Sequence, residues 1–398
     1  MIGVGMAFVW LAVVMLGLIA SAVVERRVRL ASLRGRDRWA PQKADWGFDA
    51  ERPPVVSLLA RGLAGAARLV RSRTSVRDQS PKLRWVGRFV SCVAMTSALA
   101  LVPFAGTWGG RVEGQPLLAV DLPHGLIAVA FLVLMTGLAQ VGVGLAERSP
   151  WSRLGSVGLA SQLLGGFGLF VLVLAPLVLG PFSFRLQDIV SFQQTTFSLF
   201  FWLPESLQGE GFEFLRAVQW PRWNLFVQPL TAILFLPALY FLTHRPWVAA
   251  GMTRSVGTAG LGLDSDPRDL YWGRLETRLA EVFAAALFVA LFLGAESIPF
   301  LPVSILVGAL EPLVGFALPA LLAVVLGIGV FLGKLVIVLV LVGVVHRSTA
   351  DLRGDQKLRL VALRLLPLAW GNLLLMSAIH LAVEPVPEAI VKSLSGGG

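Results

Sequence analysis

The sequence predicts an all-α integral membrane protein with about eight transmembrane helices, one interfacial amphipathic helix and both termini outside. Of its 398 residues, 56% are hydrophobic and only 15% are charged, whereas a soluble domain carries roughly a quarter charged residues. Apolar runs of about 18 residues or more, long enough to cross a hydrocarbon core of about 30 Å, recur along the whole chain. Arginines gather in the loops between these runs. We therefore expect a single polytopic membrane domain over residues 1–398.

The apolar runs place the membrane helices. We expect them near residues 2–24, 87–106, 122–146, 154–180, 223–243, 276–298, 317–345 and 361–383. The first run has no basic segment before it and no small-residue cleavage pattern before Glu25. It therefore differs from a cleaved signal peptide, and we expect it to be a retained helix.

The distribution of Lys and Arg sets the orientation. With the N-terminus outside, the inward loops are residues 25–86, 147–153, 244–275 and 346–360. These loops hold 25 Lys and Arg residues, against five in the outward loops and the C-terminal tail. The positive-inside rule therefore places both termini outside and the arginine-rich loops in the cytoplasm. The net charge of +10 follows from this topology, so we expect no nucleic-acid partner.

Two loops are too apolar to be simple connectors. In residues 55–72, apolar positions recur at helical spacing opposite a stripe formed by Arg61, Arg68 and Arg71. This pattern predicts an amphipathic helix at the cytoplasmic interface, and a plain membrane anchor without a site has the same pattern. The outward loop 181–222 is rich in Phe, Leu and Trp, and we expect it to rest on the outer interface.

The inventory of catalytic side chains is small. A single cysteine, Cys92, excludes disulfides and iron–sulfur ligation within this chain, and four histidines in four different segments exclude a His-rich metal cluster. No P-loop or dinucleotide fingerprint occurs in a strand–helix context. We therefore predict no catalytic residue, no metal site and no bound cofactor in this chain.

Ionisable residues at membrane depth remain as candidates, because burying them is costly. Glu281 lies one to two turns into the sixth predicted helix, with Glu276 and Arg278 nearer its start. A structural ion pair with Arg278 is an equally good interpretation of Glu281. Lys334, near the middle of the seventh helix, requires a carboxylate partner or a wet cavity. The basic cluster after the first helix suits either anionic lipid headgroups or the docking of a peripheral protein arm.

The order of these features resembles a known family, the H subunit (quinone-chamber membrane subunit) of bacterial NADH-quinone oxidoreductase, respiratory complex I, with its relatives in membrane-bound hydrogenases. The resemblance runs along nearly the whole chain, and no internal inverted repeat of a transporter competes with it. The motifs that carry it are Glu25-Arg26-Arg27-Val28, the segment Arg61 to Leu69, Gly155 to Gly166, Gln187-Asp188, Gln228-Pro229, Thr243 to Pro246, Leu279-Ala280-Glu281, Leu293-Gly294, Gly333-Lys334 and Leu365 to Leu375.

The resemblance implies a non-redox subunit of a proton-translocating NADH:quinone oxidoreductase, multi-pass in the bacterial inner (plasma) membrane. Quinone would be the substrate, with flavin and Fe–S clusters in partner subunits, and other membrane-arm and peripheral-arm subunits and anionic lipids as partners. It implies quinone-chamber or arm-docking roles for Glu25, Arg26, Arg27, Arg34, Arg38, Arg61 and Arg68. It implies proton-path roles for Arg245, Asp264, Asp266, Asp269, Glu276, Glu281 and Lys334.

One departure from the family bears on coupling. The family has an acid-rich loop after its fifth helix, and here residues 248–263 contain no carboxylate. The resemblance therefore implies a divergent member in which proton coupling is rerouted or reduced. The alternatives are the equivalent subunit of a hydrogenase-type complex and, from another class, a stand-alone transporter or lipid-binding scaffold.

Overall fold

The computed structural model describes residues 10–21, 23, 81–104, 119–146, 150–198, 219–243, 267–298, 317–348 and 354–383. Most of these residues are helical, in agreement with an all-α membrane protein. Within them, four helical stretches are long and apolar enough to cross a membrane: Gly125–Ala146, Ser152–Leu179, Leu321–Val344 and Gln356–Leu381. The total of about eight membrane helices and the outward position of both termini stay predictions.

These four stretches belong to α4 (Gly125–Ala146), α5 (Pro150–Leu179), α14 (Ala317–Ser348) and α15 (Gly354–Leu360) with α16 (Leu366–Val383). A π-helical turn, Val361–Leu365, joins α15 to α16. The other described helices are the first helix (Trp10–Ser21), α3 (Pro81–Ala100), α6 (Leu186–Gln193), α8 (Asn224–Val227), α9 (Pro229–Thr243) and α12 (Pro267–Phe292).

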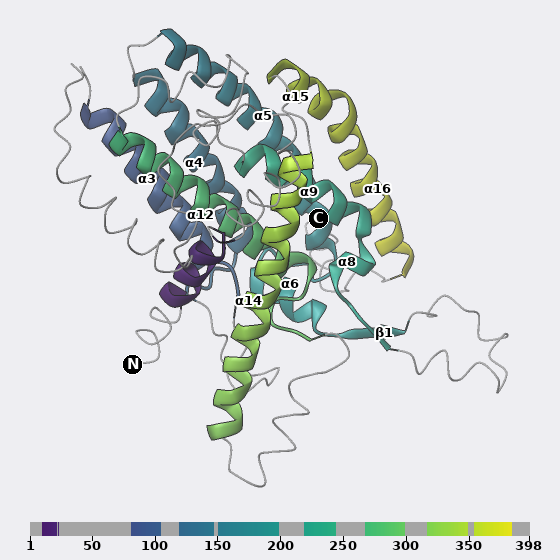
Figure 1. Ribbon diagram of the computed structural model, residues 1–398. Helices are drawn as coiled ribbons and strands as arrows, with labels where there is room; N and C mark the ends of the chain where they lie inside the picture. The colour runs from purple at the N-terminus through teal and green to yellow at the C-terminus, as the bar shows by residue number, and fades with distance from the viewer. Residues whose placement is uncertain are drawn as a thin grey trace, which may run out of the picture.

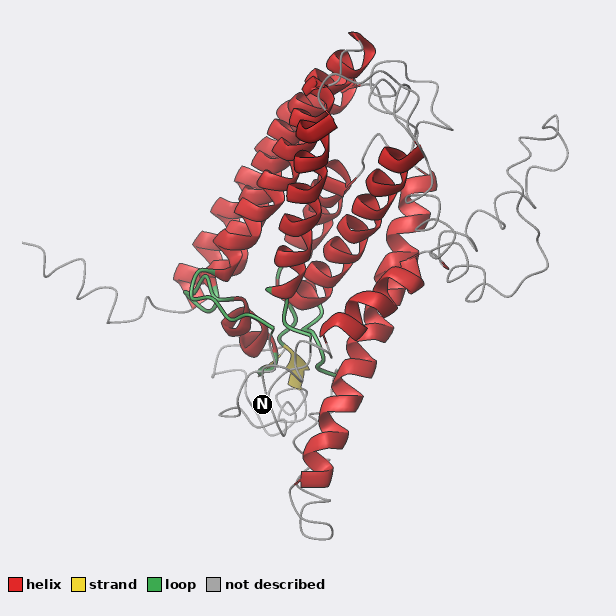
Figure 2. Cartoon of the chain, turned by 90° about the vertical axis from the view of Figure 1, so that its left-hand side faces the viewer, coloured by secondary structure: helices red, strands yellow, loops and turns green. Residues whose placement is uncertain are grey.

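Helix α12 is at the centre of the bundle, where it packs against α3, α9 and α14. Every residue from Val282 to Phe292 is buried, which includes the small residues Ala284, Ala285 and Ala286. Small side chains allow helices in a membrane to approach closely. Figure 1 shows α3, α4, α5 and α12 side by side, with α16 against α5 on the far side of the bundle. Helix α14 packs along α12 and extends beyond the bundle at one end (Figure 2).

Aromatic rings fill the core between α5, α9 and α12. The ring of Phe235 lies 5.9 Å from that of Phe170 and 5.1 Å from that of Phe292, measured between centroids, and all three side chains are fully buried. The close approach of α5 to α9 depends on a glycine, because a Cβ on Gly166 would lie 2.8 Å from the Cβ of Phe241. Interdigitated packing of this kind leaves little room for larger side chains.

Several predicted helices have different ends in the structure, among them the predicted helix 87–106, which is α3 and spans Pro81–Ala100. The predicted helix 223–243 is divided into α8 and α9 at Gln228, because the next residue, Pro229, disfavours helical backbone before it. The Gln228 side-chain amide donates to the carbonyl of Pro176 in α5 at 3.1 Å. The predicted helix 276–298 begins earlier, at Pro267, and ends earlier, at Phe292. Its first turns carry charged residues that an apolar window leaves out.

The segment 181–222, predicted as an outward loop, contains secondary structure that the sequence did not reveal. It includes α6 and two short antiparallel strands, β1 (Thr196–Ser198) and β2 (Gln219–Pro221). Just before α6, Arg185 donates from Nε to the carboxylate of Asp121 at 3.0 Å, and this hydrogen bond raises the pKa of the Arg185 guanidinium. The predicted amphipathic helix 55–72 and most of the basic loop 25–86 lie outside the described residues.

Candidate functional site

A buried polar cluster joins α3, α4 and α12. Its centre is the Glu276 carboxylate on α12, which has no exposed surface. Ser91 Oγ on α3 and Gln140 Nε2 on α4 both donate to Glu276 Oε1. The Arg88 guanidinium on α3 lies 3.7 Å from Glu276 Oε2 and is itself 3% exposed. We call Arg88, Ser91, Gln140 and Glu276 the Glu276 cluster.

Helical spacing brings these side chains together. Arg88 and Ser91 are three residues apart and therefore share one face of α3. On α4, Gln140 follows Thr136 by four residues, and the Thr136 carbonyl also accepts a hydrogen bond from Ser91 Oγ at 3.3 Å. In hydrocarbon a polar side chain must find its partners inside the protein. The Glu276 cluster thus provides a carboxylate with hydrogen-bond partners on two neighbouring helices.

A second polar cluster lies five residues further along α12. Arg278 NH1 donates to Glu281 Oε2 at 2.9 Å, and Ser21 Oγ of the first helix donates to the same oxygen at 2.9 Å. Arg278 NH1 also lies 3.3 Å from Ser21 Oγ. The side chains of Arg278 and Glu281 are 22% and 20% exposed, so this ion pair is more open than the Glu276 cluster. Glu281 therefore forms the ion pair with Arg278 that the structural interpretation of this residue predicted.

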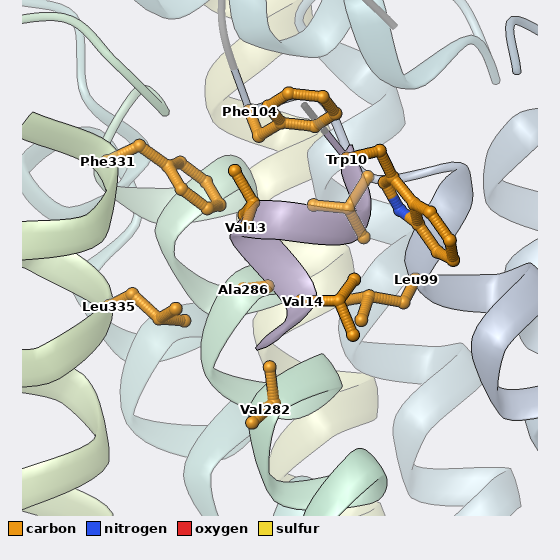
Figure 3. Close-up of a pocket in the computed structure, with 10 residues that line it drawn as sticks. Trp10, Val13, Val14, Leu99, Phe104, Val282, Ala286, Phe331 and Leu335 are labelled. Atoms are coloured by element: carbon orange, nitrogen blue, oxygen red, sulfur yellow. The ribbon is translucent and has the colours of Figure 1, made fainter. Parts of the chain in front are cut away.

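An apolar cavity adjoins this second cluster. It lies between the first helix, α12 and α14, and its walls include Val13, Val14, Val282, Phe331 and Leu335 (Figure 3). Val282 follows Glu281 directly in the sequence. The indole nitrogen of Trp10, also on the wall in Figure 3, makes no hydrogen bond within the described residues. Walls of this chemistry accept hydrocarbon rather than polar groups.

Lys334 has partners of a kind that the sequence did not suggest. We expected a carboxylate or a wet cavity. The ammonium donates to the backbone carbonyls of Leu293, Ala295 and Ser297, and the buried Glu296 carboxylate attracts it electrostatically. These carbonyls follow the end of α12. The hydrogen-bond partners of Glu281 and Glu276 described above do not include Lys334. The structure thus places Lys334 in a separate polar cluster at the other end of α12.

Most of the other predicted site residues lie beyond the part of the chain that the structure describes. Asp269 lies in α12, and its side chain is not among the described ones. Outside the described residues lie Glu25, Arg26, Arg27, Arg34, Arg38, Arg61, Arg68, Arg245, Asp264 and Asp266. Within the described residues, no group of three or more His, Cys, Asp or Glu side chains could hold a metal ion.

The structure also brings in residues that the sequence-based prediction missed. Arg88, Ser91 and Gln140 were not among the predicted candidates, although all three are buried beside Glu276. The sequence did contain a signal for Arg88 and Gln140. Arg84 and Arg88 recur four residues apart in an apolar segment, and Gln140 interrupts an apolar helix. Polar residues in such positions are functional candidates by default.

Comparison with known proteins identifies the family. Residues 6–377 match the family described as NADH dehydrogenase. A protein of Cereibacter sphaeroides, named as the second H subunit of NADH-quinone oxidoreductase, is 26% identical over 216 residues, which is 54% of this chain and 60% of that protein. The H subunit of NADH-quinone oxidoreductase from Campylobacter jejuni subsp. doylei is 28% identical over 216 residues, 52% of this chain and 56% of that protein. The chain thus spans less than two thirds of the length of these curated relatives.

The family match and the relatives' names confirm the resemblance that the motif order indicated. The matched segment includes α3, α4 and α12, the three helices that hold the Glu276 cluster. Because the match extends over nearly all of its length, the chain belongs to the NADH dehydrogenase family.

Proposed function

We propose that this chain is the H-type membrane subunit of a complex I-type NADH-quinone oxidoreductase in a bacterial inner membrane. In this role it docks the peripheral redox arm, lines part of the quinone chamber and links quinone reduction to proton translocation. It carries no redox group, and flavin and Fe–S clusters reside in partner subunits. The chain acts as an enzyme through its complex and has no activity alone.

The observation that carries the proposal is the Glu276 cluster within a chain of this family. A carboxylate can take up and release a proton, and the Ser91 hydroxyl that donates to it can pass a proton on. The Arg88 guanidinium balances the charge of the ionised carboxylate, because opposite charges attract strongly where water is excluded. Such a group is suited to binding a proton transiently at membrane depth.

The two carboxylates of α12 form an ordered pair along the helix axis. Glu281 follows Glu276 by five residues, which corresponds to about 7.5 Å of helical rise. With the arginine-rich loops in the cytoplasm, Glu276 lies nearer the cytoplasmic surface and Glu281 lies deeper.

Beyond Glu281 the helix offers no further proton carrier. Residues 282–292 of α12 are apolar and buried, and the next carboxylate is Glu296. The helical part of that interval, from Glu281 to Phe292, corresponds to about 16 Å of rise, too long for a direct transfer. A proton that reaches Glu281 must therefore leave α12 sideways, towards ordered water or a neighbouring subunit. This gap supports rerouted or reduced coupling in this divergent member.

The test uses the intact complex in inverted membrane vesicles. Glu276→Gln and Glu281→Gln remove one titratable group each with little change of shape, and NADH-driven quinone reduction and proton uptake are measured side by side. Because Glu276→Gln also weakens the helix bundle, both rates are expressed per assembled complex. On that basis we expect quinone reduction to continue while the number of protons translocated per NADH falls. Asp121→Asn, at the exposed outer edge, is the matched control and should leave both rates unchanged.

Two outcomes would reject the proposal. Wild-type proton translocation in both α12 variants would exclude the relay role. Purification of the chain as a monodisperse protein without any Fe–S-containing partner would exclude its place in such a complex.

A further inference from the structure

The backbone that follows α12 is folded so that three carbonyl groups face one point. After Phe292 the chain turns through Gly294 (φ +63°) and Ala295 (φ +48°), both in the left-handed region. A side chain at position 294 would collide with Trp223 Nε1 and with Ser297 Oγ. The turn therefore requires glycine. It directs the carbonyl oxygens of Leu293, Ala295 and Ser297 towards a single position.

The Lys334 ammonium occupies that position. Lys334 Nζ donates to the carbonyl oxygens of Leu293, Ala295 and Ser297 at 2.6, 2.9 and 2.6 Å. An ammonium on a side chain has three N–H groups, and all three have an acceptor here. The face of the Trp223 ring lies 4.3 Å from Nζ, within the range of a cation–π interaction. We call these three carbonyls and the Trp223 ring the carbonyl cage.

The carbonyl cage is held by residues other than Lys334. Trp223 Nε1 donates to Ser297 Oγ at 3.0 Å. Gln193, at the end of α6, accepts the backbone N–H of Gly294 at 3.1 Å and donates to the Ala290 carbonyl at 2.9 Å. The cage is therefore built by α6, the residue before α8, and the end of α12. Lys334 reaches it from α14, a helix that takes no other part in these hydrogen bonds.

We propose that the carbonyl cage is a binding site for a monovalent ammonium-type cation. In this protein the Lys334 ammonium occupies the site, and its hydrogen bonds connect α14 to the end of α12. Carbonyl oxygens that converge on one cation are the groups that replace water around monovalent ions in channels. Directed N–H donors suit three acceptors and one aromatic face better than a bare metal ion, which requires more oxygens. A primary ammonium is therefore the class of cation that fits the cage.

The test is replacement of the tethered cation by a free one. Lys334→Ala empties the cage, and the unfolding temperature of the full chain in lipid nanodiscs should fall by roughly 3–8 °C, because charge-assisted hydrogen bonds are lost. Ammonium or methylammonium chloride should restore most of this loss. Tetramethylammonium chloride, which has no N–H donor, should not. The wild-type protein, whose cage is full, should respond to none of these salts.

Two further variants separate this site from general effects. Lys334→Met fills the space without a charge, so it should be destabilised and gain nothing from ammonium. Phe331→Ala, one turn earlier on α14 and fully buried, should be destabilised by an apolar cavity that ammonium does not repair. If Lys334→Ala is recovered from membranes only when ammonium is present during solubilisation, that result supports the same conclusion.

Three results would overturn the proposal. They are a Lys334→Ala variant as stable as the wild type, equal recovery with tetramethylammonium, and recovery of Lys334→Met by ammonium. If Lys334→Ala cannot be isolated in any salt, Lys334→Met decides the matter, because wild-type stability of that variant would show that the cage needs no cation.

Discussion

Removing the charge of Glu276 should destabilise the helix bundle, because it breaks a buried ion pair. The Arg88 guanidinium and the Glu276 carboxylate are 3.7 Å apart, and their side chains are 3% and 0% exposed. At this separation two unit charges attract by about 4 kcal/mol with an effective dielectric constant near 20. Breaking a buried pair from one side costs about 3–5 kcal/mol in mutational studies. We therefore expect Glu276→Gln to lower the free energy of unfolding by about 3–4 kcal/mol.

The double variant gives the sharper result. Arg88→Met with Glu276→Gln removes both charges and keeps an acceptor oxygen for Ser91 and Gln140. Replacing a buried pair by neutral side chains of similar volume is often neutral, so we expect the double variant to lie within about 1 kcal/mol of the wild type. The assay is SDS titration of the full chain in mixed micelles, followed by tryptophan fluorescence.

The exposed ion pair between Asp121 and Arg185 supplies the control. Asp121→Asn breaks a contact with Arg185, whose side chain is 40% exposed, and pairs of that kind are worth less than about 1 kcal/mol. The reasoning would be refuted if Glu276→Gln were as mild as Asp121→Asn. It would also be refuted if the double variant were no more stable than Glu276→Gln alone.

Three further predictions concern packing and backbone. Gly166→Leu should lose about 1–3 kcal/mol of stability by pushing α5 away from α9, whereas Gly168→Leu, whose Cβ would meet open space, should be near neutral in the same titration. Gly294→Ala should lower the unfolding temperature, because its left-handed backbone and near neighbours leave no room for a methyl group. Phe235→Ala should cost about 3–5 kcal/mol, and Ile337→Ala, 68% exposed, less than a third of that.

Helices could be predicted from the sequence where a long apolar composition defines them. The prediction failed where individual residues determine where a helix begins or ends. Long apolar segments such as α4 and α14 were found because hydropathy alone defines them. The start of α12 was missed by nine residues because its first turns are charged, and a helix of that kind is recognised by its packing partners. The division between α8 and α9 follows from Pro229, a signal that the apolar pattern on both sides obscured.

The candidate site was predictable only in part for a related reason. Glu276 and Glu281 were found because carboxylates in an apolar segment are conspicuous. Their partners Arg88 and Gln140 come from segments far away in the sequence, and no local pattern shows which helices will be neighbours. For Lys334 the partners are backbone carbonyls, which every residue possesses. The carbonyls that bind Lys334 differ from other carbonyls only because the turn at Gly294 directs them towards one position.

The length of α14 should make the C-terminal end of α12 sensitive to the thickness of the lipid bilayer. The apolar stretch Leu321–Val344 has 24 residues, or about 36 Å of helix, against a hydrocarbon thickness of about 30 Å. Hydrophobic mismatch of that size is relieved by a tilt of about 34°, and the tilt changes with membrane thickness. Lys334 lies on this helix and donates hydrogen bonds to the turn after α12. Longer or shorter lipid chains should therefore change the force on that turn, through Lys334 and through the packing of α14 along α12.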